Sequence, residues 1–257
     1  MQYAMYLMPE LSFQALLKLS SFLFWTWLYF WFKYKVPEKS PEFYSRAITL
    51  VHGSVATVSG LIQCDIGNIC LHRFTTPILL SHYLLMIWSW GYFAFDLLWC
   101  LLYWRESKLI LFHHFCSILA IDFYMQKEQT GCTFSCTLAL MEVTNPLLQT
   151  RWYVCGDILL FLRNMGLEQS KIFLLVEVLY FVSFLVVRGM LGSYLLMKII
   201  TLDTFGIDQK AIAIGLYIIS AALIWEILSY VLHKYKNKLG KFRSFLSEMG
   251  IILDEQI

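Results

Sequence analysis

The chain has 257 residues, of which 59% are hydrophobic and 15% are charged. A soluble domain of this length does not need so much apolar surface, so the composition excludes an ordinary soluble globular protein. The formal net charge of +2 is small and gives no reason to expect a nucleic-acid partner, and we expect none.

Apolar stretches long enough to cross a bilayer follow one another along the chain. A spanning helix needs about 20 mostly apolar residues. In lipid every backbone amide must be paired internally, so these stretches are expected to be helices. We expect seven spans, at residues 11–32, 46–64, 78–104, 108–125, 130–149, 171–199 and 211–232. The second and fifth carry several Ser, Thr, Gly or Cys residues, so six spans is the alternative count. The predicted fold class is an all-α, multi-pass transmembrane helical bundle.

Lysine and arginine are distributed unevenly between the two sides of this bundle. With the N-terminus outside the cytosol, the large majority of the 20 basic residues fall on the cytosolic side. We therefore expect a non-cytosolic N-terminus and a cytosolic C-terminus. The predicted organisation is a helix and linker over 1–39, the main helical domain over 40–233 and a basic tail over 234–257. The first span lacks the positive flank of a cleavable signal peptide and is expected to remain as an anchor.

The seven cysteines are scattered along the chain. They lack the paired spacing of a zinc site or a redox dithiol, so no metal site is expected. Cys64 and Cys70 would share a non-cytosolic loop, and whether they pair is left open.

Ionisable side chains occur inside the expected spans at a common depth. At about 1.5 Å per residue, one from each of six spans lies roughly 8–14 Å from the cytosolic end of its span. They are His52, Asp96, His113, Glu142, Glu177 and Glu226. Carboxylates and imidazoles are unfavourable in hydrocarbon unless they pair or face water. We therefore expect a bundle around a polar cavity that opens to the cytosol.

Two histidines, His113 and His114, are adjacent within the apolar stretch LILFHHFCSILAI. Neighbours on a helix point about 100° apart, so both can line one wide cavity. Histidine is the most common general base, and an acid at its second nitrogen would fix the tautomer; Asp96 is the natural candidate. The pair predicts either a base for acyl transfer to a hydroxyl or amine, or hydrogen bonds that only bridge helices. No third histidine lies close in sequence, which argues against a metal site.

Steps of three and four residues give two of the spans a polar face. In the fifth span this face consists of Ser135, Leu138, Glu142, Asn145 and Gln149. Pro146 interrupts the backbone ladder there, so we expect a kink that frees a carbonyl and widens the bundle. In the sixth span Glu177 and Arg188 share a face, and Arg188 requires a carboxylate or carbonyl partner. A structural salt bridge or an anionic headgroup would satisfy it.

Four segments occur in a familiar order: YSRAITLVHG, GYFAFDLLWCLLYW, LILFHHF and LMEVTNPLLQTRWY. Together they resemble the TLC-domain family, named for the TRAM translocon protein, the Lag1 ceramide synthases and an endoplasmic-reticulum protein of ceroid lipofuscinosis. The resemblance covers about 40–233 and is strongest to the small TLC domain-containing proteins. It implies a bundle of about six helices, preceded here by the span at 11–32. It also implies residence in the endoplasmic reticulum, with the plasma membrane as the alternative, and a role in membrane lipid homeostasis. The implied partner is a membrane lipid or acyl chain, with no cofactor.

In the ceramide synthases of this family, a pair like His113 and His114 carries acyl transfer from acyl-CoA. Those enzymes continue with a His-Asp and a further Asp, where this chain reads LALMEVTNP. Glu142 stands near the first acid and Asn145 near the second, but the His is absent, which argues against ceramide synthesis. Other acyl transfer, with acyl-CoA as co-substrate, is not excluded, so the sequence leaves open whether the protein is an enzyme.

Three functional hypotheses remain. The first is lipid binding or regulation, and the substrate-binding residues would be His52, Glu142, Asn145, Glu177 and Arg188. The second is acyl transfer, and the catalytic residues would be Asp96, His113 and His114. The third is a trafficking receptor or scaffold whose polar layer is structural. The sequence does not indicate an oligomeric state.

Overall fold

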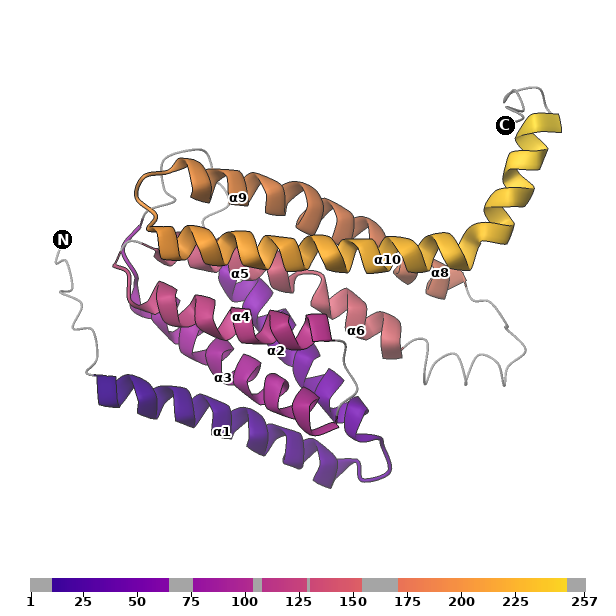
Figure 1. Cartoon of the computed structure of the whole chain (residues 1–257). Coiled ribbons are helices and arrows are strands. Elements are labelled where there is room, and N and C mark those ends of the chain that lie inside the picture. The colour runs from indigo at the N-terminus through magenta and orange to yellow at the C-terminus, as the bar shows by residue number, and fades with distance from the viewer. Residues whose placement is uncertain (1–10, 65–75, 104–107, 129, 154–170, 249–257) are drawn as a thin grey trace.

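The computed structural model describes residues 11–64, 76–103, 108–128, 130–153 and 171–248. All regular structure in these ranges is helical. The helices are α1 (Leu11–Lys35), α2 (Pro41–Cys64), α3 (Leu80–Tyr103), α4 (Lys108–Met125), α5 (Gly131–Glu142), α6 (Asn145–Tyr153), α8 (Lys171–Phe184), the π-helix η3 (Leu185–Leu191), α9 (Gly192–Thr201) and α10 (Ile207–Glu248). They run along a shared long axis as a bundle, and α10 turns away from it near its end (Figure 1).

Six continuous helical segments in the described part of the chain are long and apolar enough to cross a membrane. They are Phe13–Lys35, Pro41–Cys64, Leu80–Tyr103, Lys108–Met125, Glu177–Thr201 and Ile207–His233. The fifth of them joins α8, η3 and α9 end to end. The predicted all-helical, multi-pass fold class is confirmed, and the described residues contain six continuous spans, which is the alternative count.

The segment expected to span at 130–149 is divided into α5 and α6 by a turn at Val143 and Thr144. Pro146, in the first turn of α6, has no N–H with which to continue the hydrogen-bond ladder of α5. The carbonyl of Glu142, four residues before Pro146, therefore has no helical donor, and the turn ends the regular ladder of α5. The neighbouring carbonyl of Met141 accepts a hydrogen bond of 2.6 Å from Arg188. The interruption predicted from Pro146 is present as a break into two helices, and Arg188 bonds the carbonyl one residue before the one that Pro146 itself leaves without a donor.

A close approach of α2 to α5 holds the centre of the bundle together. A Cβ atom at Gly60 would lie 2.8 Å from the carbonyl oxygen of Ser135, so only glycine fits at this crossing. Small residues at such crossings are typical of helix packing in membranes. A disulfide between Cys64, the last residue of α2, and Cys136 in α5 fastens the same pair of helices.

This disulfide settles the partner of Cys64, because a pairing with Cys70 was the alternative left open by the sequence. That pairing is wrong for Cys64, since its sulfur is bonded to Cys136. Cys70 itself lies outside the described residues. The signal for the true pair is weak in the sequence, because the two cysteines are 72 positions apart and become neighbours only when α5 packs on α2.

The first span packs on the bundle through α3. Trp25 is fully buried, and its indole N–H donates to the carbonyl of Trp88 at 3.1 Å. Lys18, which would otherwise be a lone charge in this span, forms an ion pair with Asp122 of α4. The sequence did not predict this partner.

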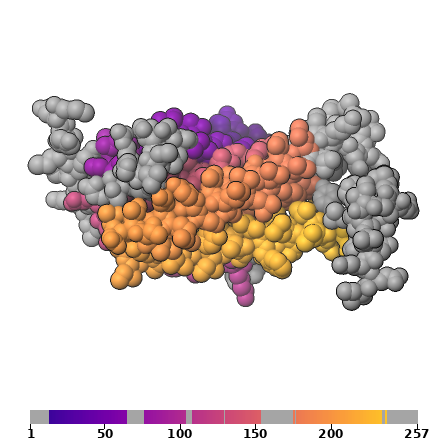
Figure 2. Space-filling model, turned by 90° about the horizontal axis from the view of Figure 1, so that it is seen from above, coloured from indigo at the N-terminus to yellow at the C-terminus, as the bar shows by residue number. Residues whose placement is uncertain are grey.

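The outer surface of the bundle is apolar. On α1 the side chains of Leu16, Trp27 and Phe30 are each more than half exposed. Such a surface would associate in water, but lipid tails solvate it. On the opposite side, α9 and α10 lie against each other (Figure 2) and are joined by a 2.8 Å contact between the hydroxyls of Ser193 and Tyr217.

Candidate functional site

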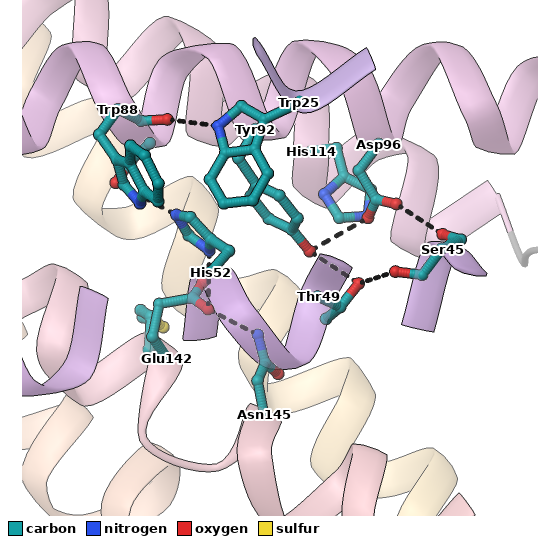
Figure 3. A network of polar contacts seen from close by, with 12 residues as sticks. Trp25, Ser45, Thr49, His52, Trp88, Tyr92, Asp96, His114, Glu142 and Asn145 are labelled. Atoms are coloured by element: carbon teal, nitrogen blue, oxygen red, sulfur yellow. Dashed lines mark hydrogen bonds and ion pairs between the residues drawn. The ribbon is translucent and has the colours of Figure 1, made fainter. Parts of the chain in front are cut away.

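Two acid–histidine pairs lie at the centre of the bundle, and Figure 3 shows them together. In the first pair, Nε2 of His114 on α4 lies 3.1 Å from Oδ2 of Asp96 on α3. The other oxygen of Asp96 accepts a hydrogen bond of 3.3 Å from Ser45 of α2. In the structure Asp96 therefore pairs with His114 rather than with His113.

The second pair joins α2 to the end of α5. Nδ1 of His52 lies 3.4 Å from Oε2 of Glu142, and Asn145 donates to the same oxygen at 2.8 Å. The opposite nitrogen of His52 lies 3.3 Å from the hydroxyl of Ser89. Both members of the pair are fully buried, with side chains 0% and 1% exposed. The break before α6 places Asn145 where it can reach Glu142.

Tyr92 of α3 connects the two pairs. Its ring stacks on the imidazole of His52, with centroids 3.8 Å apart and planes 7° from parallel. Its hydroxyl lies 3.1 Å from Thr49 and 3.4 Å from Asp96. Sequence reasoning missed Tyr92, although its spacing of four residues from Asp96 puts both side chains on one face of a helix.

Three members of the two pairs, Asp96, His114 and Glu142, border a cavity of about 340 Å³ with several polar side chains in its wall, which we call the vestibule. Its polar lining includes Asp96, His113, His114, Glu142, Asn145 and Arg188. The predicted cavity surrounded by acids and imidazoles from separate helices is therefore present. Glu42 and Arg46, at the start of α2, also line it, so the vestibule extends toward that end of the bundle.

A second, apolar cavity of about 80 Å³, which we call the chamber, lies among α4, α5, α9 and α10. Its apolar walls include Ala120, Ile121, Leu138, Leu195 and Leu216. The two cavities have four wall residues in common, which are Phe93, His113, Glu142 and Arg188. A polar and an apolar space therefore adjoin at one junction in the middle of the bundle.

Three residues of the predicted polar layer lie away from this junction. Glu177 lines neither cavity and forms an ion pair of 3.2 Å with Arg151, so the structure places it outside the substrate site proposed from the sequence. His52 lies behind Glu142 and also lines neither cavity. Glu226 is exposed at the edge of the vestibule.

Two groups of described side chains have the atoms of a metal site, but in one of them, Cys64, Cys132 and Cys136, two of the sulfurs form the disulfide. The other group lies at the first acid–histidine pair. The ligand atoms of Asp96, Cys100 and His114 all lie within 4.8 Å of one another, and oxygen, sulfur and nitrogen together suit zinc. The sequence did not suggest it, because no pair-wise cysteine or histidine spacing marks it. Asp96 is already engaged by His114 and by the hydroxyl of Ser45, so we assign the carboxylate to the hydrogen-bonded pair.

A family comparison agrees with this architecture. The family model described as the TLC domain (TRAM_LAG1_CLN8) matches residues 42–235. That range begins with α2 and runs into α10, so it contains both acid–histidine pairs and both cavities. With six helices apolar and long enough to span, the protein is an integral, multi-pass membrane protein. Because the match covers most of its length, the chain belongs to the TLC-domain family.

Proposed function

We propose that this TLC-domain protein acts in membrane lipid homeostasis by binding one lipid inside the helix bundle. The observation that carries the proposal is the junction at which the vestibule and the chamber share His113, Glu142 and Arg188. From the vestibule to the chamber the walls change from partly polar to apolar, and a lipid changes from polar to apolar from its head group to its chain. Its head group would occupy the vestibule of about 340 Å³, and its chain would enter the apolar chamber.

The proposed location is the endoplasmic reticulum, with the plasma membrane as the alternative, and the vestibule on the cytosolic side. Two features support this orientation. The excess of lysine and arginine favours it. The disulfide of Cys64 and Cys136 lies at the end of α2 that this topology assigns to the non-cytosolic side, where disulfides form. Membership of the subgroup of small TLC domain-containing proteins stays a prediction.

The proposal is tested by rescue of cells that lack the protein, with lipid composition as the readout. The wild-type chain and Lys198→Gln, a charge removal on α9 away from both cavities, should restore the lipid profile. His113→Ala, at the junction, should fail to restore it although the protein is present in the membrane at the same level. Full restoration by His113→Ala would contradict the proposal.

A second candidate function is acyl transfer, and the pair of His114 and Asp96 favours it. Donation from Nε2–H of His114 to Asp96 fixes the tautomer whose Nδ1 is basic. That nitrogen has no hydrogen-bond partner within the described part of the chain. It would take the proton of a hydroxyl or amine as that oxygen or nitrogen bonds to the acyl carbon of acyl-CoA. The C–S bond of the thioester then breaks, and the sulfur of CoA leaves as a thiol with the proton that His114 returns.

Purified protein with acyl-CoA and a panel of lysolipids or amines separates the two candidates. Acyl transfer predicts a product whose rate of formation falls about 10²–10⁴-fold in His114→Ala. Asp96→Asn should also lose activity, because an amide can turn its N–H toward the imidazole and change the tautomer. Absence of product with every acceptor, together with the failed rescue by His113→Ala, would favour lipid binding.

The third hypothesis, a trafficking receptor or scaffold, predicts a packed interior at the polar layer. The described residues instead leave two adjoining cavities there. The cavities therefore argue for a ligand in the bundle and against a polar layer that only holds the helices together.

A further inference from the structure

Arg188 is a buried guanidinium that the bundle uses only in part. The residue is 5% exposed, and Nη2 donates to the carbonyl of Met141 at 2.6 Å. The guanidinium also lies over the ring of Phe184, 5.2 Å from its centroid. Nε and Nη1 have no hydrogen-bond partner among the described residues. A buried charged donor left unpaired is unfavourable, so a polar partner is missing at this position.

An anion would suit the free N–H groups of this charged side chain. No carboxylate of the described residues lies within 4 Å of the guanidinium, so Arg188 has no ion pair there. Glu142 borders the same junction, but its Oε2 is engaged by Asn145 and His52. Glu142 therefore acts on the guanidinium only through space, and no carboxylate of the described residues contacts this positive charge in the wall of both cavities.

The backbone around Arg188 is also unusual. Arg188 lies in the middle of η3, a π-helix of seven residues. Such turns are rare and occur frequently at functional sites. Within η3 the side chains of Val186 and Met190 are 42% and 70% exposed, whereas Arg188 points into the bundle. An inward arginine would be avoided in a span that faces only lipid and packed helices, so its placement calls for a role.

We propose that Arg188 binds the anionic group of a single-chain amphiphile whose chain lies in the chamber. This inference rests on the proposed function and names its substrate class: a carboxylate, as in a fatty acid, or a phosphate, as in a lysophospholipid. A charge-assisted hydrogen bond from the unused N–H groups would hold the anion at the junction. One chain fits because the chamber of about 80 Å³ has room for roughly five to eight water-sized groups.

Binding of decanoate, decyl phosphate and decanol to the purified full-length protein in nanodiscs tests the assignment. The three ligands have the same chain and differ in the group that Arg188 would contact. We expect the wild-type protein to bind at least one of the two anions at least tenfold more tightly than decanol. In Arg188→Gln the preference should vanish because anion binding weakens while decanol binding is unchanged. A purely structural arginine would lower the affinities of all three together.

Arg188→Lys and Lys198→Gln complete the experiment. The lysine keeps the charge without the guanidinium geometry, so part of the preference should remain. Lys198→Gln removes one positive charge from α9 and should keep all of it. Equal binding of the anions and decanol to the wild-type protein would overturn the role of Arg188 and leave lipid binding intact. Binding of none of the three would overturn the proposed function as well.

Discussion

Filling the chamber should weaken the binding of long chains and spare short ones. Ala120 of α4 is 7% exposed and lies in the chamber wall, so Ala120→Leu places three further carbon atoms in this space. The chamber of about 80 Å³ accommodates roughly five to eight water-sized groups. If the added carbons displace about three methylenes of the ligand, at about 0.8 kcal/mol each, the loss is about 2.4 kcal/mol, or about 60-fold in affinity.

The assay is the dissociation constant of fatty acids of increasing length. For the wild-type protein the affinity should rise about fourfold per methylene and then level off beyond about eight carbons, when the chamber is full. Ala120→Leu should level off about three carbons earlier. Ala221→Leu makes the same change on an exposed position of α10 and should follow the wild-type curve.

The melting temperature of Ala120→Leu should change in the opposite direction to its affinity for long chains. A leucine that fills an empty apolar space should raise the melting temperature of the ligand-free protein, since the added carbons gain contacts. Ala120→Leu would then be more stable and bind long chains less tightly. An affinity curve for Ala120→Leu that matches the wild-type curve would show that the chain does not enter the chamber.

Three further predictions concern the framework of the bundle. Cys136→Ser should lower the free energy of unfolding by about 2–5 kcal/mol, and a reductant should destabilise the wild-type protein but not this variant; equal sensitivity would count against the disulfide. Gly60→Ala should destabilise by about 1–3 kcal/mol because its Cβ meets a backbone oxygen at 2.8 Å, whereas Gly215→Ala, with nothing within 4 Å, should be neutral or stabilising in the same melting experiment. Lys18→Met should destabilise by leaving the charge of Asp122 unpaired, and adding Asp122→Leu should recover much of the loss; additive losses would show that the two charges do not interact.

Much of the fold follows from the sequence, because a bilayer leaves few options. Hydrophobic length and the need to pair every backbone amide predict the helices and most of their limits. The break between α5 and α6 was less certain in its extent, because a proline kinks some helices and ends others. Here Pro146 follows a turn at Val143 and Thr144, and the segment becomes two short helices.

The composition of the site was predictable, but its pairing was not. Depth along each span predicts that Asp96, His113 and Glu142 lie at one level, and the structure places all three around the vestibule. Which acid contacts which histidine depends on the rotation of each helix about its axis, which apolar packing determines. Depth alone does not identify the residues that line a cavity. Glu177 lies at the predicted depth, but it pairs with Arg151 outside both cavities.

No pattern in the sequence predicted the apolar chamber. Its walls are ordinary leucines, isoleucines and alanines, which also form the packed parts of the bundle. Arg188 was noticed as a buried charge that needed a partner. Its partner in the structure is the carbonyl of Met141, at the end of α5 where the helix is interrupted. This bond uses only Nη2, so Nε and Nη1 remain available at the junction.

The central claim is that a lipid chain enters the bundle at the junction of the two cavities. A fatty acid with a photoreactive diazirine in its chain tests it directly, with the cross-linked peptides of the full-length protein identified by mass spectrometry. We predict adducts on chamber residues of α5 and α9, such as Leu138 and Leu195, which excess unlabelled fatty acid removes. Adducts confined to outward residues such as Leu16 and Trp27 of α1, unchanged by the competitor, would contradict the claim.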